Sequence, residues 1–133
     1  MLGSIEQMLK NYFSLQAEGL VAVYLYGSQA RGTAGAHSDV DLGLLMKTAP
    51  KPTLAGLQLD LAGDLETLLS RRVDLVVLNG APVDLVHRVL RDGKIIAEMD
   101  RSARIAFEVK ARNEYFDLLP YLNEYRRAGK ASV

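Results

Sequence analysis

Runs of apolar residues that are bounded by glycine, proline or charged residues predict four strands in this chain. The runs are Leu20–Tyr26, Val40–Met46, Val73–Leu78 and Lys94–Glu98. The first run contains only leucine, valine, alanine and tyrosine, which indicates a strand covered on both faces. The last run is expected to lie at an edge of the sheet.

Apolar residues at helical spacing predict a helix ahead of the first strand. Ser4 and Gln7 have the spacing of a capping box, so the helix is expected to begin at Ser4. Gly19 is the expected C-cap. The stripe expected to face the core consists of Ile5, Met8, Leu9, Tyr12 and Phe13.

Three further helices follow from the same periodicity. They are expected at Thr53–Ser70, at Pro82–Asp92 with Gly93 as its stop, and from Arg101 onward. Thr53 is the expected N-cap of its helix, and the leucines between positions 54 and 69 are expected in the core. Pro120 is expected to kink or end the last helix, and Arg126–Val133 to fray. One side of that helix carries Ile105, Val109, Arg112, Phe116 and Leu119.

The order of elements, α-β-β-α-β-α-β-α, predicts one α/β domain with a small sheet and helices packed on it. The domain is expected to fill residues 1–133, with its core at about 20–100 and a helical C-terminal part at about 101–128. A chain of this length is long enough to bury a hydrophobic core.

Charge and composition exclude several classes of function. Sixteen basic residues balance sixteen acidic ones, and a protein that grips long nucleic acid usually has a basic excess. The chain has no cysteine, so thiolate metal sites and disulfides are excluded. The longest apolar run is too short to cross a bilayer, and the N-terminus does not resemble a signal peptide. We therefore expect a cytoplasmic protein without a membrane or a long nucleic acid as partner.

Two aspartates stand where the second strand begins. Asp39 and Asp41 are two residues apart, so in a strand they share a face with Cα atoms about 6.5 Å apart. Two carboxylates this close repel each other unless a cation neutralises them. Magnesium prefers carboxylate oxygens, and two such ions about 3.5–4 Å apart can hold a phosphoryl group during its transfer. The pair alternatively consists of two solvated carboxylates at the mouth of a strand.

Asp74 is the candidate for a third metal-binding carboxylate. It interrupts an otherwise apolar strand, where its burial would be hard to justify without a partner. If that strand pairs beside the second one, neighbouring side chains are about 5 Å apart, close enough to share a metal ion. A simple ion pair with Arg71 or Arg72 would explain the same residue.

The connection between the first two strands has features of a phosphate-binding turn. Gly27 permits a positive φ and a close backbone approach, and a helical turn starting near Ser28 would direct free amides and a hydroxyl toward an anion. Arg31 lies on the same connection. Its guanidinium could contact a bound triphosphate, or the residue could simply lie at the surface. His37 and His87 have no second histidine or cysteine nearby, which favours structural or solvated roles.

Together these residues resemble those of a known family. Gly27 and Ser28, ten residues, then Asp39 and Asp41, with Asp74 on a later strand, resemble the nucleotidyltransferase superfamily typified by DNA polymerase β. The short chain and the segments GSQARG and SDVDL resemble the minimal nucleotidyltransferase (MNT) antitoxins, which are paired with HEPN-type toxins. The resemblance covers about residues 20–100.

The resemblance implies a fold and an activity. It implies a polymerase β-like core in which Asp39, Asp41 and Asp74 are catalytic and hold two Mg²⁺ ions, while Gly27 and Ser28 bind the nucleoside triphosphate. It further implies transfer of AMP from ATP to a tyrosine of a HEPN-type RNase toxin, in a complex with that toxin. Two alternatives remain: an antitoxin that acts by binding alone, and a transferase for a small-molecule acceptor.

Overall fold

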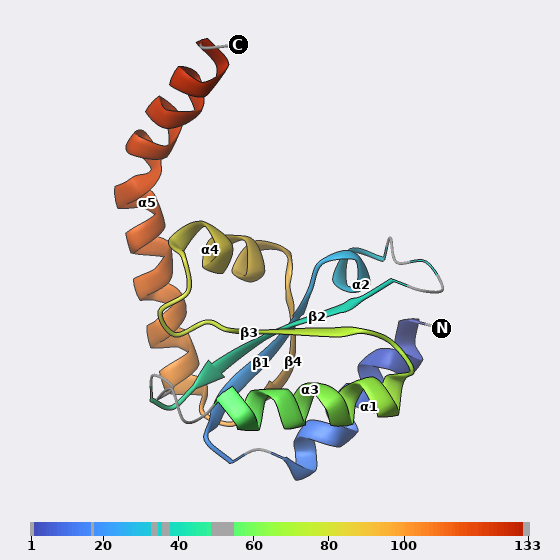
Figure 1. Ribbon diagram of the computed structural model, residues 1–133. Helices are drawn as coiled ribbons and strands as arrows, with labels where there is room; N and C mark the ends of the chain where they lie inside the picture. The colour runs from blue at the N-terminus through green and yellow to red at the C-terminus, as the bar shows by residue number, and fades with distance from the viewer. Residues whose placement is uncertain (1, 17, 33–34, 36–37, 49–54, 132–133) are drawn as a thin grey trace.

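The computed structural model describes residues 2–16, 18–32, 35, 38–48 and 55–131, with the side chains of 2–4, 55–59 and 129–131 left out. The expected N-cap Thr53, together with Leu54 and His37, therefore lies outside the described part, and so does the side chain of Leu57. Figure 1 shows the arrangement of the helices and strands in this part of the chain.

Four strands form one mixed sheet at the centre of the molecule. They are β1 (Leu20–Tyr26), β2 (Val40–Met46), β3 (Val73–Val77) and β4 (Lys94–Glu98), in the spatial order β3-β2-β1-β4. β1 runs antiparallel to β2 and to β4, whereas β2 and β3 are parallel. The predicted strands are confirmed, with β3 one residue shorter than expected, and β4 lies at an edge as predicted.

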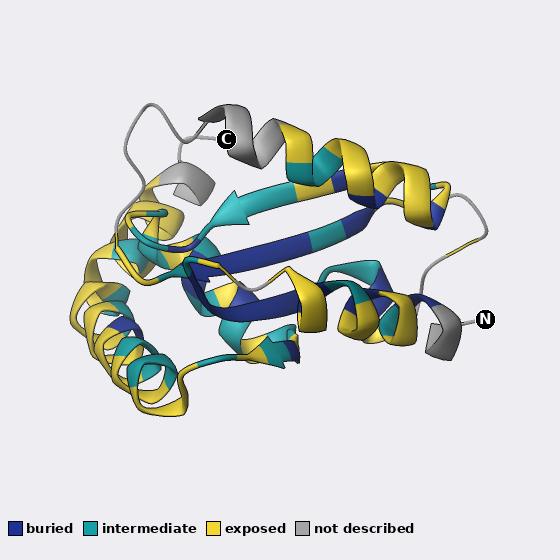
Figure 2. Cartoon of the chain, turned by 90° about the horizontal axis from the view of Figure 1, so that it is seen from below, coloured by how far each residue is buried: buried dark blue, intermediate teal, exposed yellow. Residues whose placement is uncertain are grey.

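Helices cover both faces of the sheet, which gives a three-layer architecture (Figure 1). The helices α1 (Leu2–Leu15) and α3 (Ala55–Leu69) pack on one face, and α4 (Val83–Asp92) and α5 (Arg101–Ala131) on the other. A short helix, α2 (Ser28–Arg31), follows β1. Figure 2 shows the strands mostly buried between helices whose outer surfaces are exposed. The predicted fold class, helices packed on a small mixed sheet, is confirmed.

The composition of β1 follows from this sandwiched position. Val23 and Leu25 belong to the core on the α1/α3 side, whereas Ala22 and Tyr24 belong to the core on the α4/α5 side. Because successive side chains of a strand point to opposite faces, a strand between two helical layers requires apolar residues at every position.

Several predicted helix ends are wrong. α1 begins at Leu2, so Ser4 lies inside the helix instead of capping it, and α1 ends at Leu15, four residues before Gly19. Gly19 has a φ of +77° and turns the chain into β1. In α3, Leu65 and Leu69 are buried but Leu68 is 43% exposed, so not every leucine of this helix lies in the core.

The last helix differs most from its prediction. α5 continues through Pro120 to Ala131, so Pro120 does not end it, and the expected fraying from Arg126 is absent up to Ala131. Figure 1 shows the C-terminal part of α5 extending past the sheet and α4. No helix in the described ranges is both long and apolar enough to span a membrane.

The buried side of α5 is not the side that carries Ile105, Val109 and Phe116. Ala111 is buried and Ala103 and Phe107 pack on the same core, whereas Ile105, Val109 and Phe116 are 43%, 50% and 62% exposed. We therefore define these three residues as the exposed apolar stripe of α5. Apolar residues occur on both sides of α5, so the apolar pattern by itself does not indicate which side faces the sheet.

A partly buried polar network lies on the inward side of α5. The hydroxyl of Tyr24 on β1 donates to Oε1 of Glu108 at 2.8 Å, and Arg104 Nη1 lies 2.9 Å from the other oxygen, Oε2. Arg104 also pairs with Glu98 on β4. These bonds require Arg104 and Glu108 to face the sheet, so the helix turns its small residues Ala103 and Ala111 inward with them.

Gly43 on β2 allows α4 to approach the sheet closely. A Cβ at this position would lie 3.2 Å from Leu78 Cδ2 and 3.3 Å from Val89 Cγ1, closer than carbon atoms normally pack. Val89 is fully buried and belongs to α4. The absence of a side chain at Gly43 therefore determines how near α4 lies to the middle of β2.

We expect Gly43→Val to lower the free energy of unfolding by about 1–3 kcal/mol, because its methyl groups would overpack against Leu78 and Val89. Gly63→Ala is the matched control, because a Cβ at Gly63 on the exposed side of α3 meets no atom within 4 Å. That change should be neutral or stabilise the helix by up to about 1 kcal/mol. Urea unfolding of both variants measures the difference, and equal effects would contradict the packing argument.

Candidate active site

A row of polar side chains crosses three strands at one end of the sheet. The register places Tyr26 of β1 opposite Asp41 of β2, and Asp41 opposite Asp74 of β3. The two aspartates sit at the same point of a parallel pair, so their side chains leave the same face of the sheet. Asp74 was a candidate metal ligand on the condition that its strand pairs beside β2. This pairing is confirmed.

Asp74 is exposed, which corrects the expectation that it is buried. It lies near the start of β3, and β3 is an edge strand, with a neighbouring strand on one side alone. Among the described residues it forms no ion pair with Arg71 or Arg72. The guanidinium of Arg71 instead donates to the carbonyl oxygens of Gly35 and Ser38, both at 3.3 Å.

Asp39 is placed by the segment that leads into β2. The side chain of Gln29, 98% buried, donates to the Ser38 carbonyl at 3.4 Å, and Arg71 donates to the same oxygen. The backbone N–H of Val40, the residue after Asp39, donates to the carbonyl oxygen of Arg72 at 2.8 Å. These contacts tie the residues on both sides of Asp39 to α2 and to the start of β3, while the Asp39 side chain itself is exposed.

Gly27 lies against the carboxylate of Asp41. A Cβ at position 27 would overlap Asp41 Oδ2 and approach its Cγ to 3.3 Å. Gly27 also has a φ of +73° with a ψ of −154°, a conformation that is almost confined to glycine. The predicted helical turn starts at Ser28, as α2, and the hydroxyl of the half-buried Ser28 forms no hydrogen bond with any residue that the structure describes. Glycine is therefore required here for both backbone conformation and space.

The charges around Asp41 act against its ionisation. Burial raises the pKa of the Asp41 carboxyl, and the negative charges of Asp74 and Asp39 raise it further. Arg31 and Arg88 act in the opposite direction and lower it. The three predicted carboxylates thus interact electrostatically, and the net effect is a raised pKa of the Asp41 carboxyl.

Two residues of this region were missed by the sequence analysis. Arg88 lies on α4, and its charge acts on both Asp41 and Tyr26. Tyr26 is half-buried, and its hydroxyl has a pKa raised first by burial and then by the negative charge of Asp41. Tyr26 precedes Gly27 and had been assigned to the strand alone. No sequence pattern pointed to Arg88, because only the packing of α4 on the sheet brings it near Asp41.

Within the described residues, no group of three or more histidine, cysteine, aspartate or glutamate side chains is gathered tightly enough to hold a metal ion. The roles of Asp39, Asp41 and Asp74 as metal ligands therefore stay a prediction. His87 on α4 stacks on Tyr115 of α5 at 3.5 Å between ring centroids, so it packs between two helices.

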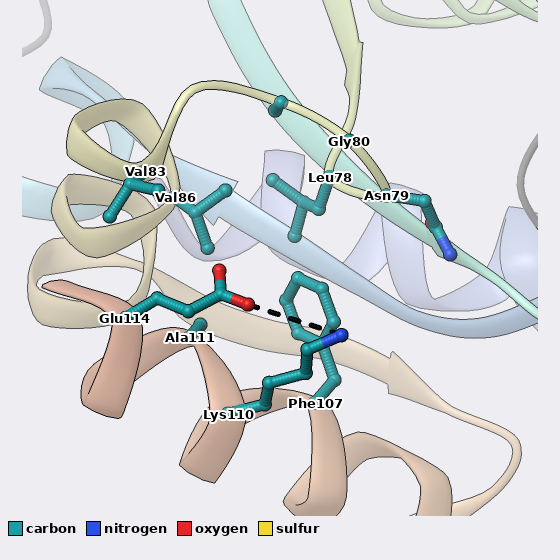
Figure 3. A pocket seen from close by; sticks show the side chains of 10 residues that line it. Leu78, Asn79, Gly80, Val83, Val86, Phe107, Lys110, Ala111 and Glu114 are labelled. Atoms are coloured by element: carbon teal, nitrogen blue, oxygen red, sulfur yellow. Dashed lines mark ion pairs between the residues drawn. The ribbon is translucent and has the colours of Figure 1, made fainter.

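A separate pocket of about 330 Å³ lies at the opposite end of β3, between the start of α4 and α5 (Figure 3). Its walls are mainly apolar, with Lys110 and Glu114 side by side at one side. None of the predicted site residues lines it. The side chain of Asn79 bonds to the backbone of Met46, so this amide holds β2 to the loop after β3.

Comparison with known families agrees with this geometry. The family model described as polymerase beta, nucleotidyltransferase, matches residues 6–102. The chain therefore belongs to this nucleotidyltransferase family. A comparison with curated proteins finds no match.

Solved structures similar to this chain come from toxin–antitoxin complexes. One such complex with AMP-PNP is 26% identical with a TM-score of 0.74, covering 96% of this chain and 97% of that one. A variant of the MntA–HpeT complex, with two aspartates two positions apart replaced by glutamate, is 25% identical, with a TM-score of 0.74 and coverages of 96% and 97%.

A third structure shows the same fold. It contains a tri-AMPylated HEPN toxin from Shewanella oneidensis with its MNT antitoxin, at 24% identity and a TM-score of 0.70, covering 100% of this chain and 98% of that one. The resemblance to MNT antitoxins noted in the sequence is thereby confirmed.

Replacing Gly27 tests the contact with Asp41. We expect Gly27→Ala to lower the free energy of unfolding by at least about 2 kcal/mol, because the new methyl group strains the backbone and displaces the carboxylate. Gly32→Ala is the control: Gly32 has the same φ of +73°, but a Cβ there meets nothing within 4 Å. Its cost should be about 1 kcal/mol. Urea unfolding gives both values, and equal losses would argue against the contact.

Replacing Asp41 tests the electrostatics. Its raised pKa means that the folded state holds the ionised carboxylate less favourably than the unfolded chain does. This penalty is absent below the unfolded pKa and fully present above the folded one. Asp41→Asn should therefore stabilise the metal-free protein at pH 7, and the gain should vanish near pH 3.

Urea unfolding at both pH values, with a chelator present, measures this gain. Asp60→Asn, at an exposed site on α3, serves as the control and should change stability little at either pH. An Asp41→Asn variant that is less stable than the wild type at pH 7 would mean that the carboxylate is held by favourable contacts instead.

Proposed function

We propose that this protein transfers AMP from ATP to a tyrosine hydroxyl of a HEPN-type RNase toxin and so acts as its antitoxin. The observation that carries the proposal is the alignment of Asp41 with Asp74 across β2 and β3, with Gly27 against the Asp41 carboxylate. Membership of the nucleotidyltransferase family supports this reading of the site.

Asp39, Asp41 and Asp74 would hold two Mg²⁺ ions. The donor set fits, because all three are oxygen ligands of the kind magnesium prefers, and the burial and repulsion that raise the pKa of Asp41 are relieved by a cation. Bound magnesium would offset the charge of the triphosphate and favour ionisation of the acceptor hydroxyl. MntA–HpeT, with two aspartates of the same spacing replaced by glutamate, lends support to Asp39 and Asp41.

The nucleotide would lie at the turn after β1. The Ser28 hydroxyl, which has no partner in the described part of the protein, would donate to a phosphate oxygen, and the missing side chain of Gly27 leaves room beside Asp41. The exposed guanidinium of Arg31 would add positive charge. The acceptor oxygen would attack the α-phosphorus, the bond to the β-phosphate would break, and pyrophosphate and the hydroxyl proton would leave.

The nature of the acceptor is supported by the similar structures. One contains a tri-AMPylated HEPN toxin with an MNT antitoxin, and another contains AMP-PNP. A protein acceptor also suits a chain of 133 residues, which has little surface to spare for walls around a small acceptor. The partner would therefore supply the hydroxyl and part of the binding surface.

Inhibition by binding alone is the second candidate, and the exposed apolar stripe of α5 favours it. Ile105, Val109 and Phe116 are well exposed on α5, and a partner protein that covered them would bury apolar surface. The C-terminal part of the same helix extends past α4 and the sheet (Figure 1). Such an antitoxin would need neither the carboxylates nor a nucleotide. The two candidates therefore differ in the expected effect of replacing Asp39 and Asp41: the replacement would abolish AMP transfer but would leave inhibition by binding intact.

The decisive experiment incubates this protein with a HEPN-type toxin, sought first in the neighbouring reading frame, together with ATP and magnesium. Intact mass spectrometry of the toxin should show a gain of one or more AMP units. The gain should fall by a factor of at least about 100 with the Asp39→Asn/Asp41→Asn variant, because removing a catalytic metal site removes most of the transition-state stabilisation.

Asp60→Asn/Asp64→Asn is the matched control, because it removes two carboxylates from α3 on the other side of the sheet; it should leave the gain in mass unchanged. Modified peptides would identify the acceptor residue by fragmentation. No gain in mass from a toxin that nevertheless forms a stable, inactive complex would reject AMP transfer and leave binding as the function.

A further inference from the structure

Arg88 on α4 has no role in the reaction proposed above. It is exposed on α4 and makes no hydrogen bond or ion pair with any residue that the structure describes. The neighbouring arginine of the same helix, Arg91, is in contrast engaged by both oxygens of Asp92, at 2.9 and 3.0 Å. Arg88 is thus a free guanidinium on a helix that packs beside the candidate site.

The packing of α4 brings Arg88 to the carboxylates. Val89, the next residue, lies directly over Gly43 of β2, which is two positions from Asp41 on the same face. At the end of α4, the backbone of Gly93 lies against Leu25 O of β1, next to Tyr26. The C-terminal half of α4 therefore crosses the sheet beside the row of Tyr26, Asp41 and Asp74.

Arg31 and Arg88 converge on this site from two different helices. The positive charges of both act on Asp41, and both also act on Asp92. Arg88 and Asp92 are four residues apart and so share one face of α4, while Arg31 comes from α2. Asp92 is already paired with Arg91, and neither Arg31 nor Arg88 forms an ion pair with a carboxylate in the described part of the chain.

We propose that Arg88, together with Arg31, binds the β- and γ-phosphates of the nucleotide, the part that leaves as pyrophosphate. This inference rests on the function proposed above. The transferred phosphorus must lie at the carboxylates, so the remaining phosphates extend away from them and need cations at the flank. Arginine suits this role because its guanidinium stays charged and binds phosphate oxygens through two parallel hydrogen bonds.

Two other arginines near the site already have partners within the protein. Arg71, one of the residues considered for the triphosphate, is occupied by the carbonyl oxygens of Gly35 and Ser38 and holds the segment before Asp39. Arg91 neutralises Asp92. Arg31 and Arg88, in contrast, form no hydrogen bond or ion pair with the residues that the structure describes, and both are exposed.

Calorimetric titration of the full chain with ATP, ADP and AMP, each with Mg²⁺, tests the inference without a toxin. Arg88→Ala should weaken ATP binding at least about tenfold, since hydrogen bonds between charged groups are lost, and should leave AMP binding unchanged. Arg88→Lys should weaken ATP binding less, because lysine keeps the charge but not the two-pronged geometry. Arg112→Ala, at an exposed position of α5, is the control and should bind every nucleotide as the wild type does.

Each outcome decides between the possibilities. An Arg88→Ala variant that binds ATP as the wild type does, or that loses ATP and AMP equally, overturns the assignment to the β- and γ-phosphates. Thermal unfolding of the variants without nucleotide checks that the exposed position left the fold intact, and Arg88→Lys carries the test if Arg88→Ala unfolds. A wild type that binds ATP but modifies no toxin would reject the proposed AMP transfer alone, and a wild type that binds no nucleotide would reject both.

Discussion

The parallel pairing of β2 with β3 is the constraint on which the rest of the site depends. It places Asp41 opposite Asp74, and a shift by one residue would send one of the two carboxylates to the other face of the sheet. The apolar neighbours Val40, Leu42 and Val73 maintain the register, because they are buried against α1 and α3. Burial on one face therefore determines where the charged groups of the other face meet.

The same arrangement makes the site costly in the absence of a ligand. Burial and two neighbouring negative charges disfavour ionisation of Asp41, and Gly27 adopts a conformation that other residues avoid. Neither feature stabilises the fold. A cation bound at these carboxylates, as proposed above, would relieve the electrostatic part of this cost and so stabilise the folded protein.

Much of the fold could be predicted because local pattern and tertiary environment agree. β1, β2 and β4 match their predicted bounds, since continuous apolar runs have few other ways to be buried. α5 could not be predicted as well: its sequence has apolar residues on two sides, and the choice between them depends on Arg104 and Glu108 bonding to Tyr24. The continuation of α5 through Pro120 likewise lies beyond a local rule.

The sequence by itself determined the spacing of Gly27, Ser28, Asp39 and Asp41, the apolar strands around them, and so the family to which the chain belongs. Those features are local, because a turn and a strand are specified by consecutive residues. Only the tertiary structure decided that Asp74 lies opposite Asp41, that Arg71 holds a loop, and that the charge of Arg88 on α4 acts on Asp41. Long-range strand pairing and helix packing set these positions, and residues far apart in the chain have no shared periodicity that would reveal them.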